Sequence, residues 1–170
     1  MARSGIFLPA IIALAIAAPA LADTDASFLL TATVKDLSNY FPAYLANGYV
    51  STLSTPRGTE GTPTYLVAFM DYATDDMSRP AAIPGWAEID YSTGPGPTGL
   101  AWLNKVPFRP SRFLDYRQTL NLREATLTSN YVYVDGQRNT AVEVETFVDQ
   151  ANPHLAATQL SITPDFASLS

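Results

Sequence analysis

The sequence predicts an all-β fold, an antiparallel β-sandwich, from two observations. The first is the segment at residues 113–164, which reads as three consecutive antiparallel strands at residues 124–134, 138–148 and 155–162. The second is a chain in which Gly and Pro separate many short apolar runs, without a clear amphipathic helical pattern. Short strands joined by Gly- and Pro-rich turns are typical of sandwiches.

The hairpin signal is strongest at Asp135 and Gly136, between two alternating runs. Asp-Gly at such a place predicts a type I′ turn, in which both central residues have a positive φ. The returning strand separates its valines from its glutamates, with Val142, Val144 and Val148 on one face and Glu143 and Glu145 on the other. A strand of this kind has one buried and one solvated face.

The first part of the chain gives less uniform signals. Residues 24–34 are apolar and fit either a strand or the start of a helix. Asn47 and Gly48 predict a tight turn, and residues 51–63 predict a loop rich in Gly, Pro and hydroxyl side chains. Residues 64–70 (TYLVAFM) predict a strand buried on both faces.

The middle of the chain predicts two connections and two strands. Residues 71–85 predict a long loop, and residues 86–91 alternate as a strand does. Residues 92–99 (STGPGPTG) predict a turn or short linker, followed by a further strand at residues 100–106. Residues 107–112 are expected to be extended, because a residue before proline avoids the α region.

The N-terminus predicts a cleaved secretory signal peptide at residues 1–22. Arg3 supplies the positive start, residues 6–18 the apolar run, and Ala20 and Ala22 the small residues before the cleavage site. The alternative is an uncleaved N-terminal anchor. Cleavage leaves one domain at residues 23–170, exported to the periplasm or the extracellular space and without a membrane segment of its own.

Composition limits the function classes. The net charge of −6 is unfavourable for binding nucleic acid, which requires basic patches. The chain has no cysteine and one histidine, which excludes Cys-type zinc sites and sites with several His ligands. We therefore expect neither a metal nor a cofactor.

No set of residues in the sequence predicts a catalytic site. The carboxylates Asp71, Asp75 and Asp76 are interpreted as solvated loop residues, and Glu143 and Glu145 as the wet face of a sheet. His154 is interpreted as a turn or strand-edge residue. Four arginines, at positions 109, 112, 117 and 123, are expected to pair with acidic residues such as Asp115 and Glu124.

Trp86 and Trp102 are the candidate carbohydrate-binding residues. Tryptophan offers a large ring face to a sugar together with a hydrogen-bond donor, and Trp86 follows a Pro-Gly loop. The alternative for both is a place in the core or rim of the sandwich.

Several phrases, in order along the chain, resemble the N-terminal domain of glycoside hydrolase family 65, which includes maltose, trehalose and kojibiose phosphorylases, acid trehalases and related α-glucosidases. They lie at residues 45–50 (LANGYV), 65–72 (YLVAFMDY), 82–86 (AIPGW), 113–120 (FLDYRQTL), and 146–149 (TFVD) followed by 154–157 (HLAA). The chain departs from the family pattern at Gly85, where Asn is usual, and near Thr119, where Gly is usual.

The resemblance implies a galactose-mutarotase-like β-supersandwich and places the chemistry elsewhere. In the family an (α/α)6 barrel follows the sandwich and carries the catalytic glutamate. We expect the chain to end before the barrel and before the sandwich is complete, and to have no turnover alone. Export favours the hydrolase branch, acting on α-glucosides such as trehalose.

Two other functions remain open on the sequence. One is a free-standing secreted carbohydrate-binding module, and the other is a structural domain that pairs through open sheet edges. The expected partners are accordingly an α-glucoside or another carbohydrate, a chain that carries the catalytic barrel, or a second copy.

Overall fold

The computed structural model describes residues 26–72, 77–96, 99–103 and 106–166. The all-β prediction is confirmed, because the regular structure of these residues is antiparallel sheet with short 3-10 turns. The signal peptide predicted at residues 1–22 lies outside the described residues. No helix in the described part of the chain is long and apolar enough to cross a membrane.

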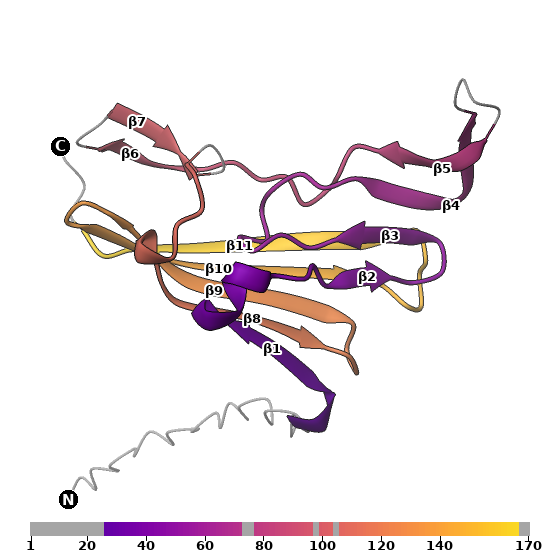
Figure 1. Ribbon diagram of the computed structural model, residues 1–170, viewed down its shortest axis with the longest axis horizontal. Helices are drawn as coiled ribbons and strands as arrows, with labels where there is room; N and C mark the ends of the chain where they lie inside the picture. Colours follow the sequence, from indigo (N-terminus) through magenta and orange to yellow (C-terminus); the bar gives the residue numbers. More distant parts are fainter. Residues whose placement is uncertain (1–25, 73–76, 97–98, 104–105, 167–170) are drawn as a thin grey trace, which may run out of the picture.

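The larger sheet has five strands in the order β1-β8-β9-β10-β11 (Figure 1). Its strands are β1 (Leu29–Thr33), β8 (Phe113–Asn121), β9 (Thr126–Asp135), β10 (Arg138–Val148) and β11 (Ala156–Pro164). The three strands predicted within residues 124–162 are therefore confirmed as β9, β10 and β11.

A second sheet has the order β2-β3-β4-β5, and a third pairs β6 with β7. Their strands are β2 (Tyr44–Ala46), β3 (Val50–Leu53), β4 (Thr64–Tyr72), β5 (Ser78–Ile83), β6 (Ser92–Gly96) and β7 (Gly99–Trp102). Short 3-10 turns complete the regular structure at η1 (Ala26–Phe28), η2 (Val34–Asn39) and η4 (Pro110–Arg112). The last of these corrects the extended conformation expected at residues 107–112.

The β9–β10 hairpin forms as predicted, but its turn is one residue further along. Asp135 pairs with Arg138, so that Gly136 and Gln137 are the central residues. Gly136 has a φ of 68°, and Gln137 is not among the residues with positive φ. This is the pattern of a type II′ turn rather than the predicted type I′.

The two main sheets pack against each other through one apolar cluster. Leu45 and Val50 come from the second sheet, and Leu127 and Val148 from the larger one. A second, aromatic cluster covers the inner face of β8, β9 and β10, and comprises Tyr91, Leu103, Phe113, Tyr116, Tyr131, Tyr133, Val142 and Val144. The inward valines and outward Glu143 of β10 follow the predicted alternation.

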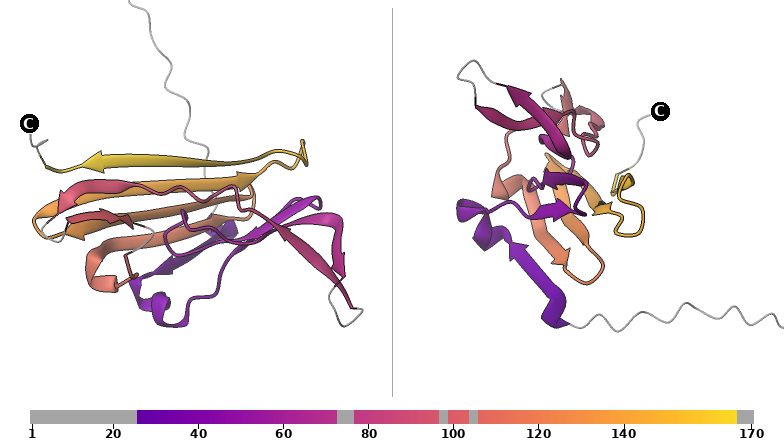
Figure 2. Two further views of the ribbon diagram at one scale, coloured as in Figure 1. Left: turned by 90° about the horizontal axis from the view of Figure 1, so that it is seen from above. Right: turned by 90° about the vertical axis from the view of Figure 1, so that its right-hand side faces the viewer.

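The prediction that residues 64–70 are buried on both faces is wrong. They form β4, but from Val67 onward the strand is exposed, and Tyr72 at its end retains 78% of its accessible surface. The pairing with β5 shifts between Tyr65 and Met70, where Ala68 has a φ of 60°. Beyond this bend the β4–β5 hairpin reaches away from the larger sheet (Figure 2), so neither face is covered.

Two predicted connections and one predicted strand also differ from the sequence prediction. The loop expected at residues 71–85 contains β5, and the turn expected at residues 92–99 contains β6. Residues 86–91 alternate but form no strand, because their backbone groups bond to separate parts of the chain. The Ile89 amide donates to the Thr59 carbonyl at 3.0 Å, while the Tyr91 carbonyl accepts from the Leu103 amide at 2.8 Å.

Candidate functional site

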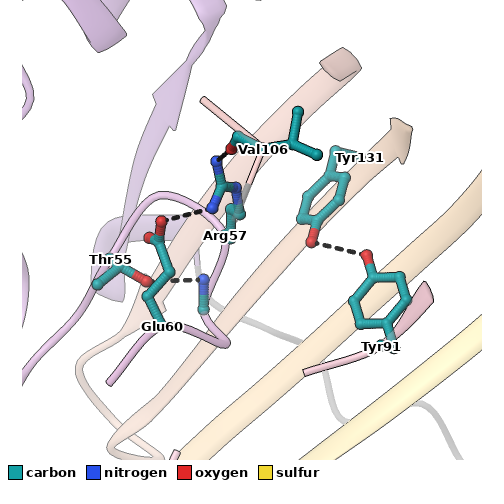
Figure 3. Close-up of polar contacts among 7 residues, drawn as sticks. Thr55, Arg57, Glu60, Tyr91, Val106 and Tyr131 are labelled. Carbon is teal, nitrogen blue, oxygen red and sulfur yellow. Dashed lines mark hydrogen bonds and ion pairs between the residues drawn. The ribbon is translucent and has the colours of Figure 1, made fainter. Parts of the chain in front are cut away.

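A loop between β3 and β4 turns the side chain of Arg57 into the molecule (Figure 3). The Gly58 amide donates to both the carbonyl and the hydroxyl of Thr55, at 3.1 Å each. Gly58 has a φ of 78°, and a Cβ there would lie 3.1 Å from Val144 and from the Ser129 hydroxyl. A larger residue would be strained in this conformation and would crowd these two side chains, so Gly58 favours the turn that directs Arg57 inward.

The guanidinium of Arg57 is buried and paired. The side chain is 2% exposed, and Nη1 donates to Glu60 Oε1 at 2.7 Å. Nη2 donates to the Val106 carbonyl. The guanidinium carbon lies 5.7 Å from the ring centre of Phe108 and 5.4 Å from that of Phe113. Arg57 therefore ties its loop to the 106–113 segment and the aromatic cluster.

Two buried tyrosines meet beside this ion pair. Tyr91 and Tyr131 place their hydroxyl oxygens 3.2 Å apart (Figure 3). Burial raises the pKa of Tyr131 to about 12 and raises the pKa of Tyr91 well above its usual range. Both phenols therefore keep their protons at neutral pH, and their contact is a hydrogen bond within the core rather than an acid–base pair.

Gln118 completes the polar interior from strand β8. Its Nε2 donates to the Thr55 carbonyl and to the Ser129 hydroxyl, at 2.8 Å each. Its Oε1 accepts from the Tyr40 hydroxyl at 2.7 Å. The amide is thus satisfied on both sides, and this network connects the Arg57 loop to the sheet.

The two candidate tryptophans lie in different parts of the fold. Trp86 follows β5, is partly buried, and packs against the cluster around Leu45 and Val148. Its indole nitrogen is buried and has no hydrogen-bond partner in the part of the chain that the structure describes. Trp102 ends strand β7, and its side chain lies outside what the structure describes.

The other ionisable residues are scattered. Asp71 is exposed on the β4–β5 hairpin, and Asp75 and Asp76 lie outside the described residues. Glu143 is exposed on the outer face of β10, where Glu145 is partly exposed. His154 lies in the β10–β11 turn, where its ring meets that of Tyr49 edge-on at 4.2 Å.

The ion pairs expected for the four arginines are not formed. Within the described residues, Arg109, Arg112, Arg117 and Arg123 have no carboxylate oxygen within 4.0 Å. Exposed arginine and carboxylate side chains gain little by pairing in water. The sequence reasoning missed Arg57, whose only signal is an arginine between Pro56 and Gly58 in a loop.

A second feature missed in the sequence is a groove along strands β2, β3 and β4 of the second sheet. It has a volume of about 760 Å³, and Tyr44, Tyr49 and Tyr65 line it together with Met70 and Arg79. Two of the lining residues are joined by a hydrogen bond, which the Tyr44 hydroxyl donates to the Ser51 hydroxyl at 3.0 Å. No group of three acidic or histidine side chains able to hold a metal ion occurs among the described residues.

Comparison with known proteins gives one family and two relatives. The sequence profile of the family described as "Glycosyl hydrolase family 65, N-terminal domain" matches residues 80–169. Two Mycobacterium tuberculosis proteins, from strains CDC 1551 / Oshkosh and ATCC 25618 / H37Rv, are 30% identical over 145 residues; each is described as an uncharacterized glycosyl hydrolase. The alignments cover 74% of this chain and 10% of each relative, so the chain spans about a tenth of these curated relatives.

Proposed function

Because the chain belongs to the glycosyl hydrolase family 65 N-terminal domains, we propose that it is the non-catalytic β-domain of an exported carbohydrate-active enzyme. The observation that carries the proposal is the match over residues 80–169, which includes β6 to β11. The substrates proposed for the whole enzyme are α-glucosides such as trehalose, cleaved by an (α/α)6 barrel outside this chain.

The arrangement of the ionisable residues supports a non-catalytic role. Hydrolysis of a glycosidic bond requires a carboxylic acid and a second carboxylate on either side of the sugar. Glu60 is instead bound to Arg57, and Glu143 is exposed on an open sheet face. The length of the relatives, of which this chain spans about a tenth, also supports a catalytic site in another part of the enzyme.

The proposal is tested by a glucose-release assay. The purified protein is incubated with trehalose, kojibiose and maltose, and free glucose is followed over many hours. We expect the rate to equal that of buffer. Release by this chain, lost on substituting one of its own carboxylates, would overturn the non-catalytic role.

Carbohydrate binding is a second proposed role, supported by the tyrosine-lined groove. Aromatic side chains on a concave surface present ring faces on which the C–H groups of a sugar pack. Three tyrosines line the groove, and Trp86 and Trp102 remain proposed as further stacking residues.

Tryptophan fluorescence separates these sites. The protein is titrated with maltose, trehalose and longer α-glucans, together with Trp86→Phe, Trp102→Phe and Tyr65→Ala variants. Loss of sugar binding in Tyr65→Ala alone would show that the sugar binds in the groove. Loss of sugar binding in a tryptophan variant would show that the sugar binds at that tryptophan. Unchanged fluorescence and no heat of binding at millimolar sugar would exclude this role.

Export is proposed from the leader at residues 1–22. Mass spectrometry of the protein recovered from an expressing bacterium should give an N-terminus at Asp23. A chain that retains Met1 in every cell fraction would contradict cleavage.

A further inference from the structure

The side-chain amide of Asn47 makes hydrogen bonds through both of its polar atoms. Its Oδ1 accepts from the Tyr49 and Val50 amides, at 3.1 Å and 3.0 Å, within the β2–β3 turn. Its Nδ2 donates to the Asp149 and Pro153 carbonyls of the β10–β11 turn. Two backbone donors on Oδ1 draw electrons away from the side-chain carbonyl carbon, Cγ, and stabilise negative charge that develops on the oxygen. The turn therefore makes Asn47 Cγ more open to attack by a nucleophile.

The backbone nitrogen of Gly48 is the nucleophile next to this carbon in the chain. Gly48 is the one glycine of the sequence that follows an asparagine. Its amide donates no hydrogen bond to the described part of the chain. Gly48 is exposed, and a Cβ at its position would meet nothing within 4 Å. Neither a side chain of its own nor a packed neighbour therefore hinders this nitrogen, and hydroxide reaches it from solvent.

Two other asparagines make a similar turn but lack an available nucleophile. Asn121 Oδ1 accepts from the amides two and three residues further along, at 3.0 Å and 3.2 Å. The amide that would have to attack, that of Leu122, already donates to the Phe28 carbonyl at 2.9 Å. Asn152 Oδ1 accepts from the amide two residues further along, but the next residue is Pro153, which has no N–H. Among these three turns, only the β2–β3 turn combines a polarised side-chain carbonyl with a free amide after it.

We propose that Asn47 is a deamidation site of the folded protein. The Gly48 nitrogen bonds to Asn47 Cγ and gives its proton to hydroxide, while the Cγ–Nδ2 bond breaks and ammonia leaves with a proton from water. Water then opens the cyclic succinimide. Cleavage of its bond from nitrogen to Cγ gives aspartate, and cleavage of its bond from nitrogen to the backbone carbonyl carbon gives isoaspartate. The net change is one water consumed and one ammonia released.

Deamidation removes the connection between the two turns. Both products lack Nδ2, which donates to the Asp149 carbonyl at 2.8 Å and to the Pro153 carbonyl at 3.1 Å, and both carry a carboxylate that accepts only. Isoaspartate also adds one atom to the backbone before Gly48 and Tyr49, which line the tyrosine-lined groove. The β10–β11 turn is therefore released, and the groove changes, as the protein ages. The reaction does not depend on the proposed carbohydrate role.

The test is peptide mapping by mass spectrometry of the folded protein, aged in mildly alkaline buffer. We expect the tryptic peptide of residues 36–57 to gain the mass of an amide-to-acid conversion, and fragment ions to assign the change to Asn47 rather than Asn39. Aspartate and isoaspartate forms should separate on elution. The rate should rise with hydroxide concentration and should exceed the rate at Asn121 roughly 10-fold or more. Asn121 is the internal control, because its oxygen makes similar contacts in the same sample.

A variant and an unfolded sample complete the test. Gly48→Ala adds a side chain beside the attacking nitrogen and should slow the conversion roughly 10-fold. Circular dichroism checks that it is folded. The urea midpoint of the wild type should fall on ageing towards that of Asn47→Asp, whereas the midpoint of Gly48→Ala should stay constant over the same time. Conversion of Asn47 in the urea-unfolded chain but not in the folded protein would overturn the proposal, as would equal rates at Asn47 and Asn121 in the folded protein.

Discussion

Arg57 Nη1 lies 2.7 Å from Glu60 Oε1, in an ion pair whose arginine is 2% exposed while its glutamate is 29% exposed. The Arg57 side chain is therefore almost completely shielded from water, whereas the Glu60 side chain keeps partial contact with it. Removing the glutamate charge therefore leaves a buried cation, whereas removing both charges leaves none. Comparing the stability of a variant that lacks the glutamate charge with that of a variant that lacks both charges therefore shows whether the ion pair stabilises the fold.

We expect Glu60→Gln to lower the free energy of unfolding by about 2–3 kcal/mol, less than for a fully buried pair because Glu60 keeps some contact with water. The Arg57→Met/Glu60→Gln double variant should be more stable than the sum of the single effects predicts. Urea unfolding of the two single variants and of the double variant measures these free energies. Glu143→Gln, on the open sheet face, is the control and should change stability by less than about 0.5 kcal/mol. A Glu60→Gln variant that matches this control would show that the pair has no stabilising role.

Two glycines of positive φ differ in the space around them. A Cβ on Gly48 meets nothing within 4 Å, whereas a Cβ on Gly58 lies 3.1 Å from Val144 and from the Ser129 hydroxyl. Gly48→Ala should therefore cost only backbone strain, about 1 kcal/mol. Gly58→Ala should cost about 3 kcal/mol, because the turn that directs Arg57 inward must also shift. Thermal unfolding of both variants provides the comparison, and equal losses would contradict it.

Asn47 connects the β2–β3 turn to the β10–β11 turn. Its Nδ2 donates to the carbonyls of Asp149 at 2.8 Å and Pro153 at 3.1 Å, while its Oδ1 accepts from the Tyr49 and Val50 amides. Asn47→Asp removes both donated bonds and turns a carboxylate oxygen towards two carbonyls. We expect a loss of about 2 kcal/mol in urea unfolding.

Asn152→Asp is the matched control for this substitution. The Asn152 side chain only accepts a bond, from the His154 amide, and an aspartate retains that contact. Its stability should stay within about 0.5 kcal/mol of the wild type. If the two variants lost the same stability, the donated bonds of Asn47 would not be the cause.

The buried tyrosines predict a loss of stability in alkali. Burial raises the pKa of Tyr131 from 10.0 to about 12, so the folded protein holds this proton more tightly than the unfolded chain does. The stabilisation is fully present below about pH 10 and is lost as the pH rises through about 12. Urea midpoints measured from pH 8 to pH 12 should fall over that range. Tyr131→Phe, which has no phenol to ionise, should show a shallower fall, and an unchanged slope would contradict this assignment.

The sequence alone determined the β9–β10–β11 meander and the all-β class. The signals there are local: side chains alternate with a period of two, Gly136 marks the hairpin turn, and each strand pairs with the next one along the chain. The same local logic placed the Asn47-Gly48 turn. It misplaced the hairpin turn by one residue, because Asp135 continues the ladder by pairing with Arg138.

The tertiary structure alone decided which apolar residues are covered and which charged residue is buried. The composition of residues 64–70 suits a core strand, yet β4 passes beyond the larger sheet and no layer covers its far half. Arg57 lies in a loop with the composition of an exposed one, yet Glu60, the Val106 carbonyl and two phenylalanine rings enclose its guanidinium. Burial depends on which segments distant in sequence pack together in space, and a local pattern of residues does not contain that information.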